Sequence, residues 1–181
     1  MTGIEHLTLL QHLNVSENAL IDLEGIGKLK RLVTFYAQVN QLGRVESFED
    51  ENKNRQYDLG ETINDESGNG KRDVDPLVEL QSLPSLVNLH LYGNLIQTTK
   101  SMGNMPKLQV LLLGGNKIQQ LEGIAGFPNL KRLSLSDNRL NDLTGIENLS
   151  SLEYLYLVEN RICDLRPLAK LRKVRELRLQ R

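Results

Sequence analysis

One polar segment of the sequence has the residue types and spacing of a calcium-binding loop. Four ligand positions of that loop and its turn glycine are matched by Asp65, Ser67, Asn69, Asp73 and Gly70. The match then fails, because Arg72 stands where an apolar residue is expected and Pro76 stands where a bidentate glutamate should complete the oxygen shell. We interpret the segment as a polar surface loop and keep a metal-dependent or catalytic role for residues 64–75 as an alternative.

Other catalytic arrangements are missing from the sequence. The three histidines, His6, His12 and His90, belong to no HExxH motif, and no GxSxG or CxxC motif occurs. The Gly70-Lys71 pair lacks the upstream glycine and the following Ser or Thr of a phosphate-binding loop. We therefore predict a protein that is not an enzyme and that uses no cofactor.

Asparagines recur along most of the chain with a constant spacing. Asn18 and Asn40 are 22 residues apart, and the same interval separates the members of a second series. That series consists of Asn94, Asn116, Asn138 and Asn160. Apolar residues keep fixed offsets around each one, so that residues 130–146 read LxxLxLxxNxLxxLxxI, the signature of a leucine-rich repeat.

This spacing predicts an α/β fold, a leucine-rich repeat solenoid. The LxL pair has the period of a short strand with one buried face, and the triplet spacing after it suits a bend with a short helical or extended return. We expect a curved right-handed coil with short parallel strands on its concave face and the helical or extended segments on its convex face. The asparagines should bond free backbone groups at each turn, which makes them structural rather than catalytic.

We predict one domain over residues 1–181, with an irregular stretch at about 49–76. The interval from Asn40 to Asn94 is two periods plus ten residues, which leaves two interpretations open. A degenerate repeat would place Tyr57 and Leu59 on a strand and Thr62 in the asparagine position, whereas a plain excursion would add no coil. Either way we expect about ten extra residues, within 64–75. Both ends fall within a repeat, so we expect a part of a longer polypeptide or a chain with trimmed ends.

Composition restricts the expected cellular location and the class of partner. The net charge of −1 gives no general attraction to nucleic acid or membranes, and no apolar run approaches the roughly 18 residues of a membrane span. The single cysteine, Cys163, allows no internal disulfide, which favours a cytoplasmic or nuclear location; an extracellular one stays open. Acidic residues gather at 46–66 and basic residues at 166–181. We interpret both groups as solvated surfaces, and keep binding of an acidic partner by the basic group as an alternative. We expect a monomer.

The predicted concave wall is the candidate binding surface. Side chains that alternate with the buried leucines should face outward, and these include four of the five tyrosines and two arginines. Tyrosine and arginine are enriched at binding hot spots, and we expect the tyrosines to form a single docking patch. The candidate partner-binding residues on this wall are Tyr36, Gln38, His90, Tyr92, Leu112, Arg132, Tyr154 and Tyr156. Cross-strand packing of these residues is the structural alternative.

The repeats resemble a known subclass. LEGIGKLKRL from Leu23 and NKIQQLEGIAGFPNLKRLSLSDNRL from Asn116 are similar to the 22-residue leucine-rich repeats of the nuclear regulatory subunit of protein phosphatase 1, which axonemal dynein light chains and tubulin-folding cofactors share. Bacterial internalins use nearly the same period. The resemblance implies that concave side chains hold a phosphatase catalytic subunit. The matching positions are Tyr36, Tyr92, Arg132, Asp137, Tyr154, Tyr156 and Glu159.

Our leading hypothesis is a protein-protein interaction scaffold that binds a folded protein on its concave surface. The alternative is a secreted or surface adhesion module of the internalin type. Nucleic-acid binding is not expected, because aromatic residues are not interleaved with the basic residues of the C-terminal region.

Overall fold

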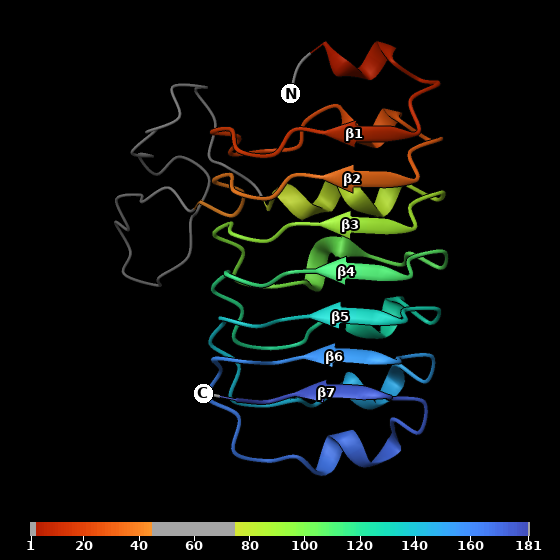
Figure 1. The fold of residues 1–181 in the computed structure, drawn as a ribbon. Helices are drawn as coiled ribbons and strands as arrows, with labels where there is room; N and C mark the ends of the chain where they lie inside the picture. Colours follow the sequence, from red (N-terminus) through yellow and green to blue (C-terminus); the bar gives the residue numbers. More distant parts are fainter. Residues whose placement is uncertain (1–2, 45–74, 181) are drawn as a thin grey trace, which may run out of the picture.

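The computed structural model describes residues 3–44 and 75–180. These residues form a stack of coils, each of which contributes one short strand to a single seven-stranded parallel sheet with the order β1-β2-β3-β4-β5-β6-β7 (Figure 1). The strands are β1 (His12–Asn14), β2 (Thr34–Tyr36), β3 (Asn88–His90), β4 (Val110–Leu112), β5 (Arg132–Ser134), β6 (Tyr154–Tyr156) and β7 (Glu176–Arg178). Each strand pairs with the strands of the adjacent coils, so the predicted solenoid is confirmed.

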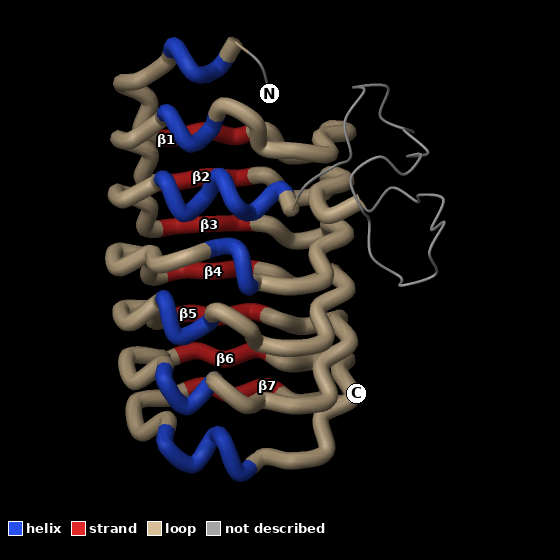
Figure 2. Tube along the Cα trace, turned by 180° about the vertical axis from the view of Figure 1, so that it is seen from behind, coloured by secondary structure: helices blue, strands red, loops and turns tan. Residues whose placement is uncertain are grey.

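Short 3₁₀ helices lie behind the sheet, one before each strand in the chain (Figure 2). They are η1 (Ile4–His6), η2 (Ile26–Lys28), η3 (Pro76–Ser82), η4 (Lys100–Met102), η5 (Ile124–Gly126), η6 (Ile146–Asn148) and η7 (Arg166–Lys170). Four of them, η1, η2, η5 and η6, follow directly on a glycine with positive φ. Glycine adopts this left-handed backbone without the steric cost of a Cβ atom, so it starts the helix at the same place in each of these coils.

The leucines fill one continuous core between the sheet and the helices. The middle residue of each strand faces inward, and in β2 to β6 this residue is fully buried. The outermost coils are less covered, since Leu9 is 70% exposed in the first coil and Leu177 is 42% exposed in the last. Each coil buries its apolar side chains mainly against its two neighbours, as expected of a solenoid.

A ladder of buried asparagines runs along the turns that follow the strands. Asn116 shows the arrangement: its Nδ2 donates to the carbonyl oxygens of Leu113 at 2.9 Å and of Leu91, in the preceding coil, at 3.0 Å. Its Oδ1 accepts from the backbone N–H of Ile96 at 3.0 Å, also in the preceding coil. The same contacts recur at Asn40, Asn94, Asn138 and Asn160. The amide therefore satisfies backbone groups that the turn removes from water, which confirms its predicted structural role.

Strands β2 and β3 pair directly across the long interval between Asn40 and Asn94. Thr34 in β2 pairs directly with Asn88 in β3, 54 residues later, whereas other paired strands are 22 residues apart, so one coil holds 32 extra residues. Within residues 3–44 and 75–180 no strand of the sheet lies between β2 and β3. The expected degenerate repeat or excursion at about 49–76 therefore stays a prediction. Residues 45–74, including Tyr57, Leu59 and Thr62, lie outside the described part of the chain.

Helix η3 fixes the point at which the chain returns to the stack. The Asp75 side chain accepts a hydrogen bond from the N–H of Leu77 at 3.0 Å and one from the Ser101 hydroxyl. Glu79 Oε2 accepts from the N–H of Gly27 at 3.1 Å, which joins η3 to the neighbouring η2. These contacts explain how 32 extra residues in one coil leave the register of the sheet unchanged.

Candidate functional site

The outward side of the sheet, here called the strand face, is formed by the first and third residues of each strand. The register aligns these residues in two columns across the stack. The first column is His12, Thr34, Asn88, Val110, Arg132, Tyr154 and Glu176, and the second is Asn14, Tyr36, His90, Leu112, Ser134, Tyr156 and Arg178. In a strand these positions face away from the buried middle residue, so distant parts of the sequence share one surface.

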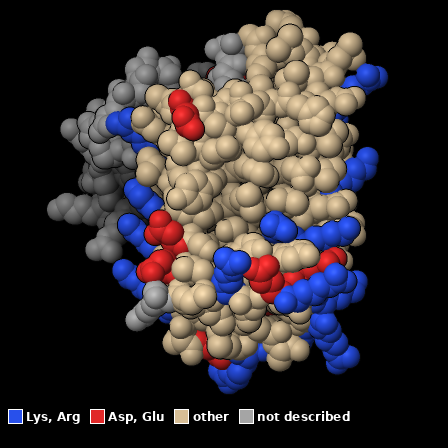
Figure 3. All heavy atoms as spheres, viewed as in Figure 1, with Lys and Arg blue, Asp and Glu red and all other residues tan. Residues whose placement is uncertain are grey.

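The strand face has two chemically different halves. Over β1 to β4 its columns contain no Asp, Glu, Lys or Arg, whereas β5 to β7 contribute Arg132, Glu176 and Arg178. Figure 3, viewed onto the strands, shows the same division, with charged side chains gathered over the lower coils and a largely uncharged surface above them.

The uncharged half is centred on an aromatic contact between neighbouring coils. The rings of Tyr36 and His90 meet edge to face, with centroids 4.6 Å apart and planes at 82°. Burial lowers the pKa of His90 below its ordinary value, so the imidazole is neutral at pH 7. Leu112 lies next to His90 in the same column and is half-buried. This half can offer ring edges, a neutral imidazole and apolar surface to a ligand.

Tyr92 lies two residues beyond β3 and is 53% exposed. Its ring lies against the next coil, where a Cβ atom added to Gly114 would be 3.0 Å from Tyr92 Cδ2. The Gly114-Gly115 pair therefore makes room for the Tyr92 ring, a role that the sequence alone did not indicate.

The charged half holds a cluster of arginines and tyrosines from three coils. The guanidinium carbon of Arg132 lies 4.5 Å from the centroid of the Tyr154 ring and 6.0 Å from that of Tyr156, and Arg178 lies 5.3 Å from the Tyr156 ring. The Tyr156 hydroxyl donates to Glu176 Oε2 at 3.2 Å, and Arg178 Nε donates to Glu176 Oε1 at 2.8 Å. Cation–π contacts and hydrogen bonds thus hold these side chains in defined positions.

The predicted residues lie where the strand alternation places them, and their tyrosines fall in two groups along the sheet. Tyr36 and Tyr92 belong to the uncharged half, and Tyr154 and Tyr156 belong to the charged half, about four strand spacings or roughly 19 Å from Tyr36. The tyrosines therefore share one side of the sheet, and the expectation that they form one docking patch stays a prediction. Gln38 lies beyond β2, and its Oε1 is enclosed without a hydrogen bond from the described residues.

Asp137 and Glu159, which the resemblance placed among the concave residues, occupy the turn after the strand. Both have left-handed backbone, with φ of 55° and 54°, immediately before a ladder asparagine. Their backbone N–H groups donate to the carbonyl oxygens of Val158 and Gln180, and their side chains are exposed. They lie at the rim of the strand face rather than on it.

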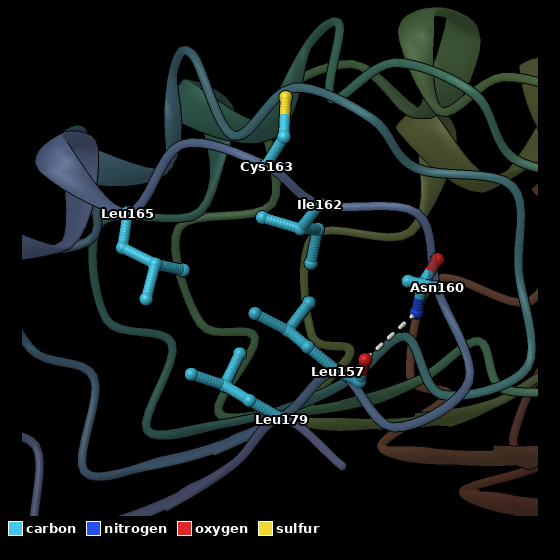
Figure 4. A pocket seen from close by; sticks show the side chains of 6 residues that line it. All are labelled: Leu157, Asn160, Ile162, Cys163, Leu165 and Leu179. Atoms are coloured by element: carbon cyan, nitrogen blue, oxygen red, sulfur yellow. Dashed lines mark hydrogen bonds between the residues drawn. The ribbon is translucent and has the colours of Figure 1, made fainter. Parts of the chain in front are cut away.

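The described part of the chain offers no cluster of metal-binding side chains, and a cavity at its last coil is lined mainly by apolar residues. No group of three or more His, Cys, Asp or Glu side chains in residues 3–44 and 75–180 is placed to hold a metal ion. The calcium-like segment of residues 65–74 falls outside these ranges. An apolar cavity of about 390 Å³ lies at the last coil and is lined by Leu157, Asn160, Ile162, Cys163, Leu165 and Leu179 (Figure 4). It is the open end of the leucine core.

Comparison with known proteins identifies the repeat. The leucine rich repeat family model matches residues 84–140 and 106–162. A leucine-rich repeat protein of Leptospira interrogans is 25% identical with a TM-score of 0.75, and the match covers 97% of this chain and 38% of that one. An internalin (inlF) of Listeria monocytogenes is 24% identical with a TM-score of 0.61, over 96% of this chain and 49% of that one. Internalin C2 of the same organism is 26% identical with a TM-score of 0.54, over 93% and 70%.

These matches and the sheet topology define the described chain as a leucine-rich repeat solenoid. The chain spans less than half of the length of each of the first two structures. No curated protein sequence gives a significant match. Among the described residues, no helix is both long and apolar enough to cross a membrane.

Proposed function

We propose that this chain is a non-catalytic scaffold that binds a protein partner on its strand face. The observation that carries the proposal is the set of aromatic, apolar and arginine side chains that the sheet register brings to one solvent-facing surface. Tyr92 and Arg132 are exposed, and Tyr36, Leu112 and Tyr156 are half-buried. Such side chains supply contact area with a polar group attached and dominate the energetics of many interfaces.

The backbone beneath this surface supports the proposal because it is rigid. Each strand of the sheet is paired in register with its neighbours, and the asparagine ladder fixes the turns that follow. A surface held in this way loses little conformational entropy when a partner binds, so more of the contact energy appears as affinity.

Two biological settings are candidates for this scaffold. Resemblance of the repeats to the nuclear regulatory subunit of protein phosphatase 1 supports an intracellular protein whose partner is a phosphatase catalytic subunit. Similarity to two Listeria internalins supports a secreted or surface adhesion module. In both settings the strand face is the binding surface, and the residues proposed to contact the partner are Tyr36, Gln38, His90, Tyr92, Leu112, Arg132, Tyr154 and Tyr156, with Asp137 and Glu159 at the rim.

The first experiment is affinity capture from lysate by the immobilised chain and by the double variant Tyr154→Ala/Tyr156→Ala. We expect the variant to lose the captured partner, because both rings belong to the charged half of the strand face. The matched control is Val78→Ala/Arg166→Ala, which removes exposed side chains from η3 and η7 on the helical side. Capture that survives the tyrosine substitutions, or is lost equally in the control, would place binding elsewhere.

A second pair of measurements separates the two settings. Purified catalytic subunit of protein phosphatase 1 is passed over the immobilised chain, and the labelled chain is incubated with intact mammalian cells. Retention of the catalytic subunit, lost in the tyrosine variant, supports the phosphatase setting. Cell binding that is lost in the same variant supports the adhesion setting.

A further inference from the structure

Arg132 differs from the other arginine of the strand face in its partners. Arg178 is neutralised by Glu176, with its Nη2 2.6 Å and its Nε 2.8 Å from Glu176 Oε1. Arg132 is exposed and stacks on Tyr154, yet among the described residues its guanidinium has neither a carboxylate partner nor a hydrogen-bond acceptor. It is therefore a positioned cation whose N–H groups remain available.

The ring contacts give this cation a fixed orientation. Stacking on Tyr154 at 4.5 Å, with Tyr156 at 6.0 Å, restricts the long side chain before any ligand arrives. A guanidinium presents its donors in a planar fork that matches the two oxygens of a carboxylate, and a pre-oriented fork loses less entropy when it binds. The nearby Glu153 does not compete for Arg132, because its carboxylate faces Arg175 at 3.6 Å.

The neighbours of Arg132 define what surrounds the bound carboxylate. The register places Val110 of β4 on one side and Tyr154 of β6 on the other. Leu112 and Ser134 follow in the adjacent column, at the edge of the uncharged half. An acidic side chain at Arg132 would therefore be flanked by apolar surface towards β4 and by an aromatic ring towards β6.

We propose that Arg132 is the carboxylate-binding position of the strand face and receives an Asp or Glu side chain of the protein partner, with an adjacent apolar residue of that partner over Val110 and Leu112. This inference rests on the proposed protein-binding function and names the chemistry that the partner must present. It predicts that the chain selects acidic over basic or neutral protein segments through one residue.

The test uses a phage-displayed library of random 12-residue peptides. Seven strands about 4.8 Å apart span roughly 29 Å, which an extended peptide of about nine residues covers. The library is selected on the full chain, on Arg132→Gln and on Arg166→Gln, an exposed arginine of η7 that is paired with Asp164. We expect Asp and Glu to be enriched on the unmodified chain and on Arg166→Gln, and this enrichment to be lost on Arg132→Gln.

Calorimetric titration of the most enriched peptide then measures the coupling energy between Arg132 and the acidic residue of the peptide. Arg132→Gln should weaken binding at least about tenfold, because a charge-assisted bidentate pair is lost. Replacing the selected Glu or Asp of the peptide by its amide should weaken binding to the unmodified chain similarly and have no further effect on the Arg132→Gln variant. Unchanged melting temperatures would show that Arg132→Gln remains folded.

The possible failures are distinguishable. Enriched peptides without an acidic excess, or the same acidic excess on Arg132→Gln, would overturn the role of Arg132 and leave the scaffold proposal standing. If the unmodified chain enriches no peptide, or enriches peptides equally well after the Tyr154→Ala/Tyr156→Ala change, the strand face is not the binding surface and both proposals are overturned.

Discussion

The asparagine ladder and the strand face are built by the same coils, yet they differ in how the sequence varies along them. From the second to the sixth coil the ladder repeats one residue with one set of contacts, and each amide is at least 92% buried. The strand face has a different pair of residues in every coil, and these residues range from buried to exposed. The fold requires the asparagine ladder to be uniform, because every turn removes the same backbone groups from water. It leaves the residues of the strand face free to vary for recognition.

The largest expected effect is on the ladder. Asn116→Ala removes donors to Leu91, Leu113 and Gly114 and the acceptor for the Ile96 N–H, all within 3.1 Å. Because these backbone groups stay buried without partners, we expect the free energy of unfolding to fall by about 3 kcal/mol. Urea denaturation followed by circular dichroism measures the loss.

Asn18→Ala is the matched control, since Asn18 has the same repeat position in the first coil. Asn18 is exposed and donates only to the carbonyl oxygens of Val15 and Ser16, so its loss should cost less than about 1 kcal/mol. Equal losses at the two sites would show that burial is not the source of the ladder's contribution.

A change just before a ladder asparagine should stabilise the protein. Val39 has φ of 55°, a left-handed conformation that is strained for a β-branched residue, whereas the next two coils have Gly93 and Gly115 there. Val39→Gly removes a backbone strain of about 1–2 kcal/mol from the folded state. Glycine also has more conformational entropy in the unfolded chain, which offsets part of this gain, so we expect the free energy of unfolding to rise by about 1 kcal/mol. The reciprocal Gly93→Val should destabilise; a gain from both changes would contradict the strain argument. Thermal and urea unfolding of both variants measure the effect.

On the strand face, single substitutions should have small effects on stability. Arg132→Ala removes an exposed side chain whose recorded contacts are with the Tyr154 and Tyr156 rings, so we expect a loss of about 0.5 kcal/mol. Asn138→Ala in the same coil should cost several times more. A loss at Arg132 as large as that at Asn138 would mean that the strand face also determines stability, and the comparison between the strand face and the asparagine ladder would fail. Parallel urea titrations decide between these results.

The smallest expected effect is a pH dependence from His90. Burial lowers its pKa in the folded state below the ordinary 6.5, so between these two values the unfolded state binds more protons. Stability should therefore fall as the pH decreases through 6.5 and level off below the folded pKa. We expect the urea midpoint to drop between pH 7.5 and 5.0, and to drop less in His90→Gln. The carboxylates with lowered pKa values lose their contribution only at lower pH.

Sequence reasoning predicted the fold and the strand face better than it predicted the contacts on that face. Leu133 and Leu135 are buried and Arg132 is exposed as the two-residue alternation requires. The left-handed backbone at Val39 was not foreseen, because a β-branched residue gives no sign of that conformation. The separation of the tyrosines into two groups was also missed, since it depends on which coils carry them and on how their rings pack.

The repeat spacing by itself determined the solenoid, the inward-facing leucines and the asparagine turns, because each coil contacts mainly its neighbours and local spacing is enough to specify such contacts. Only the tertiary structure decided that β2 pairs directly with β3 across 54 residues. It also decided that Tyr156 lies between Arg132 and Arg178, which come from different coils. Side-chain contacts between coils depend on the strand register and on the side-chain rotamers, and the period of the repeat specifies neither.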